Sequence, residues 1–250
     1  MAADFRLGIQ SYCFRKFQPL DKLVEALKAC GLGYVELWPG HLAVETPDDE
    51  RDAQFGSLRD AGIGIDSAGV FRFTADEAAN RRIFEYCKAA GAAKSITADP
   101  DGDDETLALC DRLCEEYDAR LAVHNHGRRH RWGHYDQLDA VFGKTGERIG
   151  LCLDTGWAID SGIDPLQAAR KYRDRLYGVH LKDFVYNATG QGRRDVITGT
   201  GYLDLPALLK LLNGFDYSGA LAIEYEGNAD APVDDVKACV AQVQDALKQI

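Results

Sequence analysis

The chain has 250 residues, of which 46% are hydrophobic and 28% charged, an ordinary composition for a folded domain with a full apolar core. Its formal net charge of −11 disfavours nucleic acid as a partner, because binding to phosphates needs a cationic face. Seven cysteines without a Cys-x-x-Cys pair, no signal-peptide pattern and no apolar stretch of membrane-span length together predict a cytoplasmic protein with no membrane contact.

Short apolar runs of β type alternate with amphipathic segments along the whole chain. The runs predict strands at residues 7–9, 34–37, 63–65, 94–97, 121–123, 149–153, 176–179 and 220–223. Helical spacing of apolar residues predicts helices at residues 20–29, 48–60, 76–89, 105–117, 135–142, 165–172, 205–212 and 233–247. Eight βα units in 250 residues favour an α/β fold of one domain, a single (β/α)8 TIM barrel over residues 1–250.

Glycines support these boundaries. Gly31, Gly62 and Gly91 each follow a predicted helix, where a left-handed residue commonly ends the helix. No Gly-x-Gly-x-x-Gly pattern follows the first strand, so the sequence does not support dinucleotide binding.

Polar side chains that commonly bind metals follow four apolar runs in the second half of the chain. The strands of a parallel barrel point their C-terminal ends at one face, where such folds carry their active sites, so we expect these side chains to meet there. They are His124, His126, Asp154, His180, Lys182, Glu224 and Glu226.

Asp154 ends an almost wholly apolar strand, where an ionised carboxylate is costly unless it is paired or binds a cation. The alternative is that Asp154 caps the turn that follows. His180 and Lys182 share one strand face, because strand side chains alternate, so both are expected to point into the barrel mouth. There Lys182 would stabilise negative charge or donate a proton.

Glu224 and Glu226 also share a face, and Glu224 is the stronger candidate because it is nearer the apolar run. Glu226 would contact substrate or act as a base, with a solvated loop carboxylate as the alternative. His124 and His126 form a third such pair, and at least one is expected to function, although the sequence does not decide which. Imidazole beside carboxylate suits Mn, Fe, Co or Zn rather than Ca.

Three further residues are candidates for substrate binding. Glu36 and His41 follow the second predicted strand, and Trp157 could lie against a sugar face, with packing as its alternative. Residues 128–131 form the one basic cluster, which is either a solvated loop or a site for an acidic substrate group.

The order of these residues resembles the xylose-isomerase-like barrels, the sugar phosphate isomerase and epimerase group that also includes inosose dehydratases and apurinic endonucleases. The resemblance covers essentially the whole chain. It rests on Glu36-Leu37-Trp38-Pro39-Gly40-His41, His124-Asn125-His126, Leu153-Asp154-Thr155-Gly156, Val179-His180-Leu181-Lys182-Asp183, Gly199-Thr200-Gly201-Tyr202-Leu203-Asp204 and Ile223-Glu224. It implies one divalent ion (Mn, Co, Zn, Fe or Mg) with Asp154, His180 and Glu224 as ligands.

Two positions depart from the family pattern. Many epimerases carry a glutamate on strand five that binds metal and moves a proton, and the matching residue here is His124. The common Asp-Thr-Gly-His after strand six ends in Trp157 instead. His124 is therefore expected as a metal ligand, but a mechanism with two glutamates cannot be carried over.

The predicted function is a divalent-metal-dependent isomerase or epimerase of a sugar or sugar derivative, working through an enediolate by proton transfer next to a carbonyl. Glu224 or a histidine such as His124 would take the proton, assisted by Lys182 or Glu36. The alternative is a dehydratase or lyase on a keto-sugar or inosose, since the same enediolate can expel a β-substituent. A nuclease and a barrel that only binds ligands are further alternatives. The expected partner is a small carbohydrate, and homo-oligomer formation is left open.

Overall fold

The computed structural model describes residues 5–190 and 192–250 and contains the predicted barrel. Eight parallel strands close in the order β1-β10-β7-β6-β5-β4-β3-β2. Their bounds are β1 Leu7–Gln10, β2 Tyr34–Leu37, β3 Gly64–Phe73, β4 Ile96–Pro100, β5 Leu121–His124, β6 Ile149–Asp154, β7 Leu176–Leu181 and β10 Ala220–Ile223. The prediction of a (β/α)8 fold is confirmed.

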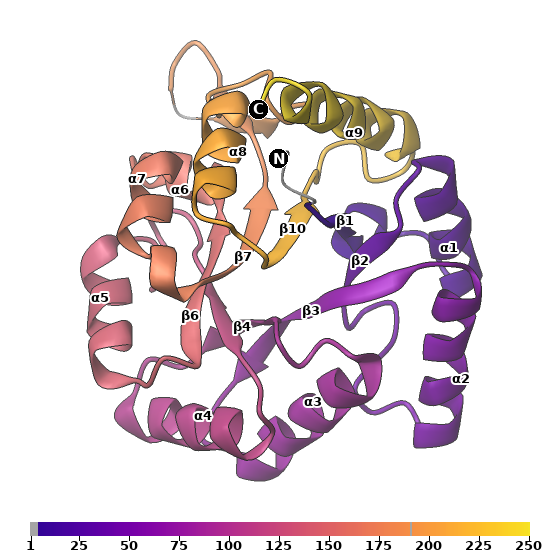
Figure 1. Ribbon diagram of the computed structural model, residues 1–250, viewed down its shortest axis with the longest axis vertical. Coiled ribbons are helices and arrows are strands. Elements are labelled where there is room, and N and C mark those ends of the chain that lie inside the picture. The colour runs from indigo at the N-terminus through magenta and orange to yellow at the C-terminus, as the bar shows by residue number, and fades with distance from the viewer. Residues whose placement is uncertain (1–4, 191) are drawn as a thin grey trace.

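Helices lie around the outside of these strands (Figure 1). They are α1 Leu20–Ala29, α2 Asp48–Asp60, α3 Glu77–Ala90, α4 Asp104–Glu116, α5 Tyr135–Lys144, α6 Thr155–Asp160, α7 Pro165–Lys171, α8 Leu205–Gly214 and α9 Val233–Leu247, with 3₁₀ turns at Ser11–Phe14 and Arg173–Arg175. Each long helix turns an apolar stripe to the barrel, as α1 does with Leu20, Leu23 and Leu27. Among the described residues, no helix combines the length and the apolar composition that crossing a bilayer requires.

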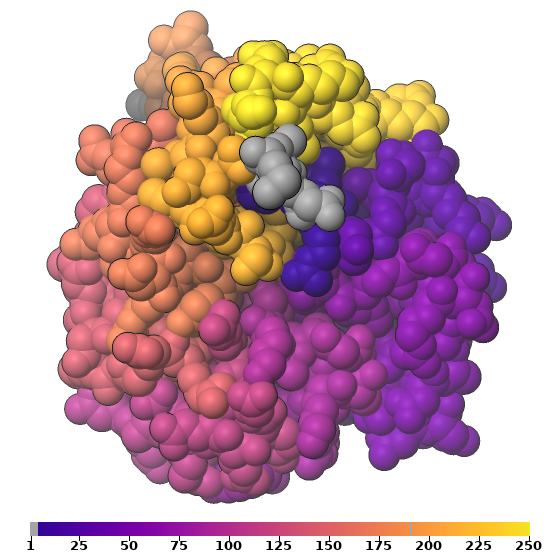
Figure 2. All heavy atoms as spheres, in the orientation of Figure 1, coloured from indigo at the N-terminus to yellow at the C-terminus, as the bar shows by residue number. Residues whose placement is uncertain are grey.

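Pairing of the first and last barrel strands closes the ring. Ile9 of β1 is in register with Ile223 of β10, so the indigo start and the yellow and orange end of the chain lie together at the surface (Figures 1 and 2). Asp154 of β6 is likewise in register with His180 of β7. This alignment brings ligand-type side chains to one level at the C-terminal ends of the strands.

Two elements were not expected from the sequence. A small antiparallel hairpin, β8 Phe184–Tyr186 with β9 Arg193–Asp195, follows β7 on the C-terminal side of the barrel. Helix α6 starts directly after β6, and Asp154 caps it by accepting a hydrogen bond from the Trp157 amide at 2.7 Å. Both elements border the site described next.

Candidate active site

Four buried side chains meet at the C-terminal ends of four neighbouring strands. His124 ends β5, Asp154 ends β6, His180 lies in β7 and Glu224 follows β10. One nitrogen or carboxylate oxygen from each lies within 4.8 Å of the others. These residues are the four that the sequence nominated as ligands, and the barrel brings them together.

Two buried carboxylate oxygens in this cluster face imidazole nitrogens. Asp154 Oδ1 accepts a hydrogen bond from the Trp157 amide, which leaves Oδ2 without a hydrogen-bond donor and 3.6 Å from His124 Nε2. Glu224 Oε2 lies 2.6 Å from His180 Nδ1, an ion-pair contact when that nitrogen carries a proton. Buried carboxylate oxygens are costly unless a hydrogen bond or a cation compensates. Two imidazole nitrogens and two carboxylate oxygens therefore fit a divalent transition-metal ion.

The protonation states of the cluster are strongly shifted. Burial, reinforced by the neighbouring His180 ring, lowers the pKa of His124 to about 3, so this imidazole is neutral at physiological pH. Burial raises the pKa of Asp154 to about 6. Burial alone would raise the pKa of Glu224 as well, but Lys182 and His180 hold it well below its usual range.

His180 differs from His124 in the direction of its pKa shift. Burial alone would lower its pKa, but Cys152, Glu36 and Glu224 lie against the ring and raise it well above its usual range. A metal ion and a proton would therefore compete for the same imidazole nitrogen of His180, because metal ligation needs a neutral imidazole.

Glu36 lies behind His180. Its Oε2 is 3.0 Å from His180 Nε2 and accepts a hydrogen bond from Ser67 Oγ at 2.6 Å, and its Oε1 accepts one from Gln10 Nε2 at 2.7 Å. A carboxylate in this position fixes the orientation of a ligating imidazole. His41 is also occupied, with Nδ1 3.1 Å from Ser11 Oγ and Nε2 3.1 Å from the Phe14 carbonyl oxygen. The substrate contacts expected of Glu36 and His41 stay predictions, and the structure gives both side chains protein partners.

Lys182 covers the Glu224 side of the cluster. Its buried ammonium donates to Glu224 Oε1 at 3.0 Å and to Glu226 Oε1. It also lies 5.3 Å from the centre of the Trp157 ring. Burial would lower the pKa of Lys182, but Glu224, Asp154 and Glu226 raise it above its ordinary value. The side chain is therefore a charged donor rather than a base.

His126 lies next to the cluster rather than in it. Its Nδ1 is 3.3 Å from His124 Nδ1, and its ring centre is 6.2 Å from that of Trp157. Burial, with His124 and His130 nearby, lowers the pKa of His126 to about 3. Of the two candidate histidines, the structure therefore places His124 among the potential ligands and His126 at the mouth.

Asn125 is a residue of the site that the sequence did not assign. Its side-chain amide donates to the Asp154 carbonyl oxygen at 3.0 Å and accepts from the Asp154 backbone N–H at 2.8 Å. This pair of hydrogen bonds fixes the end of β6 against the end of β5. Its place between two histidines was the only signal in the sequence.

A closed parallel barrel with a ligand cluster at the C-terminal ends of its strands defines the class of TIM-barrel proteins with a candidate metal site. Residues 24–242 match the sequence profile of the xylose isomerase-like TIM barrel family. The chain belongs to that family.

Curated relatives with similar sequences include several dehydratases. The chain is 25% identical over 237 residues to an inosose dehydratase of Geobacillus kaustophilus, covering 78% of this chain and 77% of the relative. It is 31% identical over 104 residues to the rhizopine catabolism protein MocC of Rhizobium meliloti, covering 36% of this chain and 32% of the relative. An inosose dehydratase of Klebsiella pneumoniae is 32% identical over 106 residues, with 36% of each protein covered. In the last two, the match spans only about a third of the relative's length.

Solved structures share the fold over nearly the full chain. The IolI protein, solved with a bound zinc atom, has a TM-score of 0.77 at 17% identity and covers 98% of this chain and 99% of its own. The probable 3-DHS dehydratase AsbF of Bacillus anthracis has a TM-score of 0.76 at 14% identity, covering 96% and 99%. The 3-keto-D-glucoside 4-epimerase YcjR of E. coli has a TM-score of 0.74 at 17% identity, covering 97% and 100%. At these identities the likeness shows the fold.

Proposed function

We propose that the protein is a divalent-metal-dependent dehydratase that removes water from a keto-sugar or a keto-polyol such as an inosose. Three observations support this proposal: the four-residue cluster, the buried Asp154 Oδ2 that has no hydrogen-bond donor, and the curated relatives named as inosose dehydratases. The sequence favoured an isomerase or epimerase and kept the dehydratase as its alternative. The order of these two functions is now reversed.

His124, Asp154, His180 and Glu224 would hold the ion. When bound, a divalent ion would act as a Lewis acid that polarises the substrate carbonyl and makes the neighbouring C–H bond more acidic. The metal could be Mn, Co, Zn, Fe or Mg, and the nitrogen and oxygen donors favour the transition metals.

Proton transfer falls to the Lys182–Glu226 pair. Both oxygens of Glu224 are committed, one to Lys182 and one to the cluster, whereas the Glu226 side chain is 30% exposed at the mouth. Burial, opposed by Lys182, raises the pKa of Glu226, which makes it a better base than an ordinary carboxylate. Glu226 would take the proton from the carbon next to the carbonyl.

The second half of the reaction needs an acid. The electron pair of the broken C–H bond forms the new double bond, and the C–O bond to the β-hydroxyl breaks. Glu226, now protonated, gives its proton to that hydroxyl, which leaves as water, while the Lys182 ammonium stays charged and holds Glu226 through their hydrogen bond. One proton is taken and one is given, so the pair returns to its starting state.

The observation that carries dehydration over epimerisation is that the groups for proton transfer lie on one side of the site. Glu226 follows β10 and is hydrogen-bonded to Lys182, which follows the neighbouring strand β7. On the other side, the end of β5 carries His124, which the proposal assigns to the metal, and no carboxylate. Epimerisation needs a proton acceptor or donor on each face of the carbon, whereas elimination can be served by one wall.

Nuclear magnetic resonance of substrates in D2O tests the proposal. Metal-reconstituted protein is incubated with a panel of inososes and keto-sugars. We expect loss of water with at least one member of the panel, abolished in Lys182→Met and kept in the exposed control Lys22→Met. Deuterium exchange or a new stereoisomer without loss of water would instead support the isomerase or epimerase, and no reaction or exchange with any member would count against the enediolate chemistry.

A further inference from the structure

We propose that the cavity beside the ligand cluster binds an oxyanion group of the substrate, a carboxylate or a phosphate, so that the substrate is an acidic sugar derivative. This inference rests on the proposed function, because it assigns the far end of the same substrate. The cavity has a volume of about 420 Å³ and is lined by His126, Arg128, Arg129, Trp157, Asp160 and Arg193, together with Gly127 and His130. This volume is in the range of small-molecule sites.

The cavity joins the ligand cluster through two shared walls. His126 lines it and approaches His124 with a distance of 3.3 Å between their Nδ1 atoms. Trp157 lines it from the other side, and its ring faces the Lys182 ammonium. A ligand in the cavity would therefore extend toward the reacting groups.

The walls carry three arginines and a single carboxylate, in a chain whose net charge is −11. Arg193 Nη1 lies 3.3 Å from Asp160 Oδ1, and its guanidinium stacks at 4.1 Å from the centre of the Trp157 ring. Asp160 is already used, because it also accepts hydrogen bonds from the Arg128 backbone N–H at 3.2 Å and the Tyr186 hydroxyl at 3.3 Å. The arginine charge therefore exceeds the carboxylate charge here.

The basic loop after β5 divides into two parts. Arg131 turns away and pairs with Asp101 at 2.6 Å. Within the described part of the chain, the side chains of Arg128 and Arg129 form no ion pair and line the cavity. The two arginines of this loop that line the cavity are thus exposed and available to a ligand. Planar guanidinium groups bind carboxylate and phosphate in bidentate fashion.

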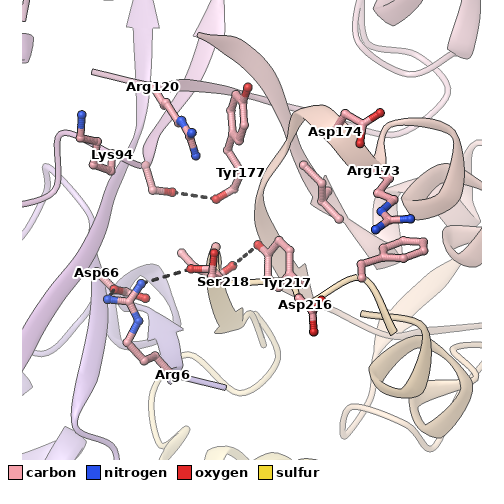
Figure 3. A pocket seen from close by; sticks show the side chains of 15 residues that line it. Arg6, Asp66, Lys94, Arg120, Arg173, Asp174, Tyr177, Asp216, Tyr217 and Ser218 are labelled. Carbon is pink, nitrogen blue, oxygen red and sulfur yellow. Dashed lines mark hydrogen bonds and ion pairs between the residues drawn. The ribbon is translucent and has the colours of Figure 1, made fainter. Parts of the chain in front are cut away.

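A second cavity is also lined by arginines, but it lacks the excess of positive charge that an anion site needs. It lies at the N-terminal ends of the strands, opposite the ligand cluster (Figure 3). There Arg6 pairs with Asp66 at 2.9 Å, Lys94 pairs with Asp118 at 2.5 Å, and two more carboxylates line the walls. That cavity is nearly balanced in charge, whereas the one beside the cluster is not.

Calorimetric titration with three probes tests the inference: neutral D-fructose, the carboxylate 5-keto-D-gluconate and the phosphate ester D-fructose 6-phosphate. We expect at least one anionic probe to bind about tenfold or more tightly than fructose, with an advantage that shrinks as salt is added. Arg193→Gln and Arg129→Gln should each remove most of this advantage, and the exposed control Arg82→Gln should keep it. The anion that loses more affinity in Arg193→Gln identifies the preferred group.

The outcomes separate this inference from the proposed function. Equal binding of neutral and anionic probes, or arginine variants that bind like the parent, would overturn the anion site while leaving the proposed dehydration of a neutral ketone untouched. If the protein prefers the anionic probes but neither retains metal nor dehydrates any ketone, the anion site would be supported and the proposed function would be wrong. Arg129 is exposed, so its variant should fold even if Arg193→Gln does not.

Discussion

Glu36 Oε2 lies 3.0 Å from His180 Nε2, at the opposite edge of the ring from the nitrogen that faces the ligand cluster. The contact joins β2 to β7 across the barrel interior and fixes the plane of the imidazole. Burial opposes the charge on Glu36, but His180 and the Ser67 hydroxyl hold its pKa below the ordinary value, so the carboxylate is ionised. Glu36 is therefore a positioning residue for the ligand His180.

Replacing Glu36 by Gln should weaken metal binding by roughly 10- to 100-fold, the range found when such supporting carboxylates are removed. The amide keeps the shape of the side chain but not the charge that orients the ring. Metal content after dialysis against a graded chelator measures the effect, and the exposed Glu25→Gln is the matched control. Unchanged metal affinity in Glu36→Gln would show that the contact is only structural.

Metal binding should weaken as the pH falls through about 6. Burial raises the pKa of Asp154 to that value, and a carboxylate must lose its proton to bind metal. In the metal-free protein, the same pKa shift makes the folded state more stable at low pH than at high pH. Because the folded pKa lies above the ordinary 3.8, protonation favours the folded state, and this stabilisation is lost as the pH rises through about 6.

Thermal unfolding with and without added zinc or manganese measures both effects. The rise in Tm caused by metal should be larger at about pH 8 than at about pH 5. Asp154→Asn should remove most of the metal effect and make the metal-free protein more stable than the parent at the higher pH. A metal-induced rise in Tm that stays constant across this range would contradict the assignment of Asp154.

The barrel and the four ligand candidates could be predicted from the sequence because both are local signals. Apolar runs set the strands, and the polar residue after each run lies in the strand or directly behind its last residue. The structure confirms Asp154 as a helix cap, since Oδ1 accepts from the Trp157 amide, and its role as a metal ligand through Oδ2, which faces the cluster, stays a prediction. The cap and the cluster use different oxygens of one carboxylate.

The remaining features depend on distant contacts that no local pattern encodes. Glu36 meets His180 across 144 positions in the chain and Ser67 across 31. Strand β3 runs on to Phe73, well beyond the predicted 63–65, because pairing with β4 outweighs the polar residues that interrupt its apolar run. Strand β9 of the hairpin carries exposed arginines instead of alternating apolar residues, so its sequence resembles a loop.

Acid stability should depend in part on Glu77. Hydrogen bonds from Arg112 and Arg81 lower the pKa of this surface carboxylate from 4.5 to about 2. A group whose folded pKa is depressed stabilises the protein above its ordinary pKa, and the contribution is lost as the pH falls toward the folded value. Glu77→Gln should therefore lower Tm at about pH 6 and make no difference near pH 2, with the exposed Glu25→Gln as control. An equal drop in Tm at both pH values would show that Glu77 does not act through its charge.

Asp183 should control the order of the loop between β9 and α8. Its carboxylate accepts backbone hydrogen bonds from Phe184 at 2.9 Å, and in the loop from Gly199 at 3.0 Å, Gly201 at 2.8 Å, Tyr202 at 2.8 Å and Leu203 at 3.0 Å. One buried side chain thus satisfies amides that would otherwise lose their partners. Removing such an acceptor costs about 1–3 kcal/mol for a buried donor left without one, so Asp183→Ala should lower the free energy of unfolding by at least about 2 kcal/mol.

Hydrogen exchange locates this effect. The amides of residues 199–203 should lose protection in Asp183→Ala, while those of the barrel strand β5 should keep theirs relative to the global stability. Asp183→Asn is the informative companion, because its single carbonyl oxygen can serve only part of the donors and should give an intermediate loss. The exposed Asp60→Ala should change neither quantity. If loop protection in Asp183→Ala matched the parent, the amides would have found other acceptors, and Asp183 would not be the residue that holds the loop.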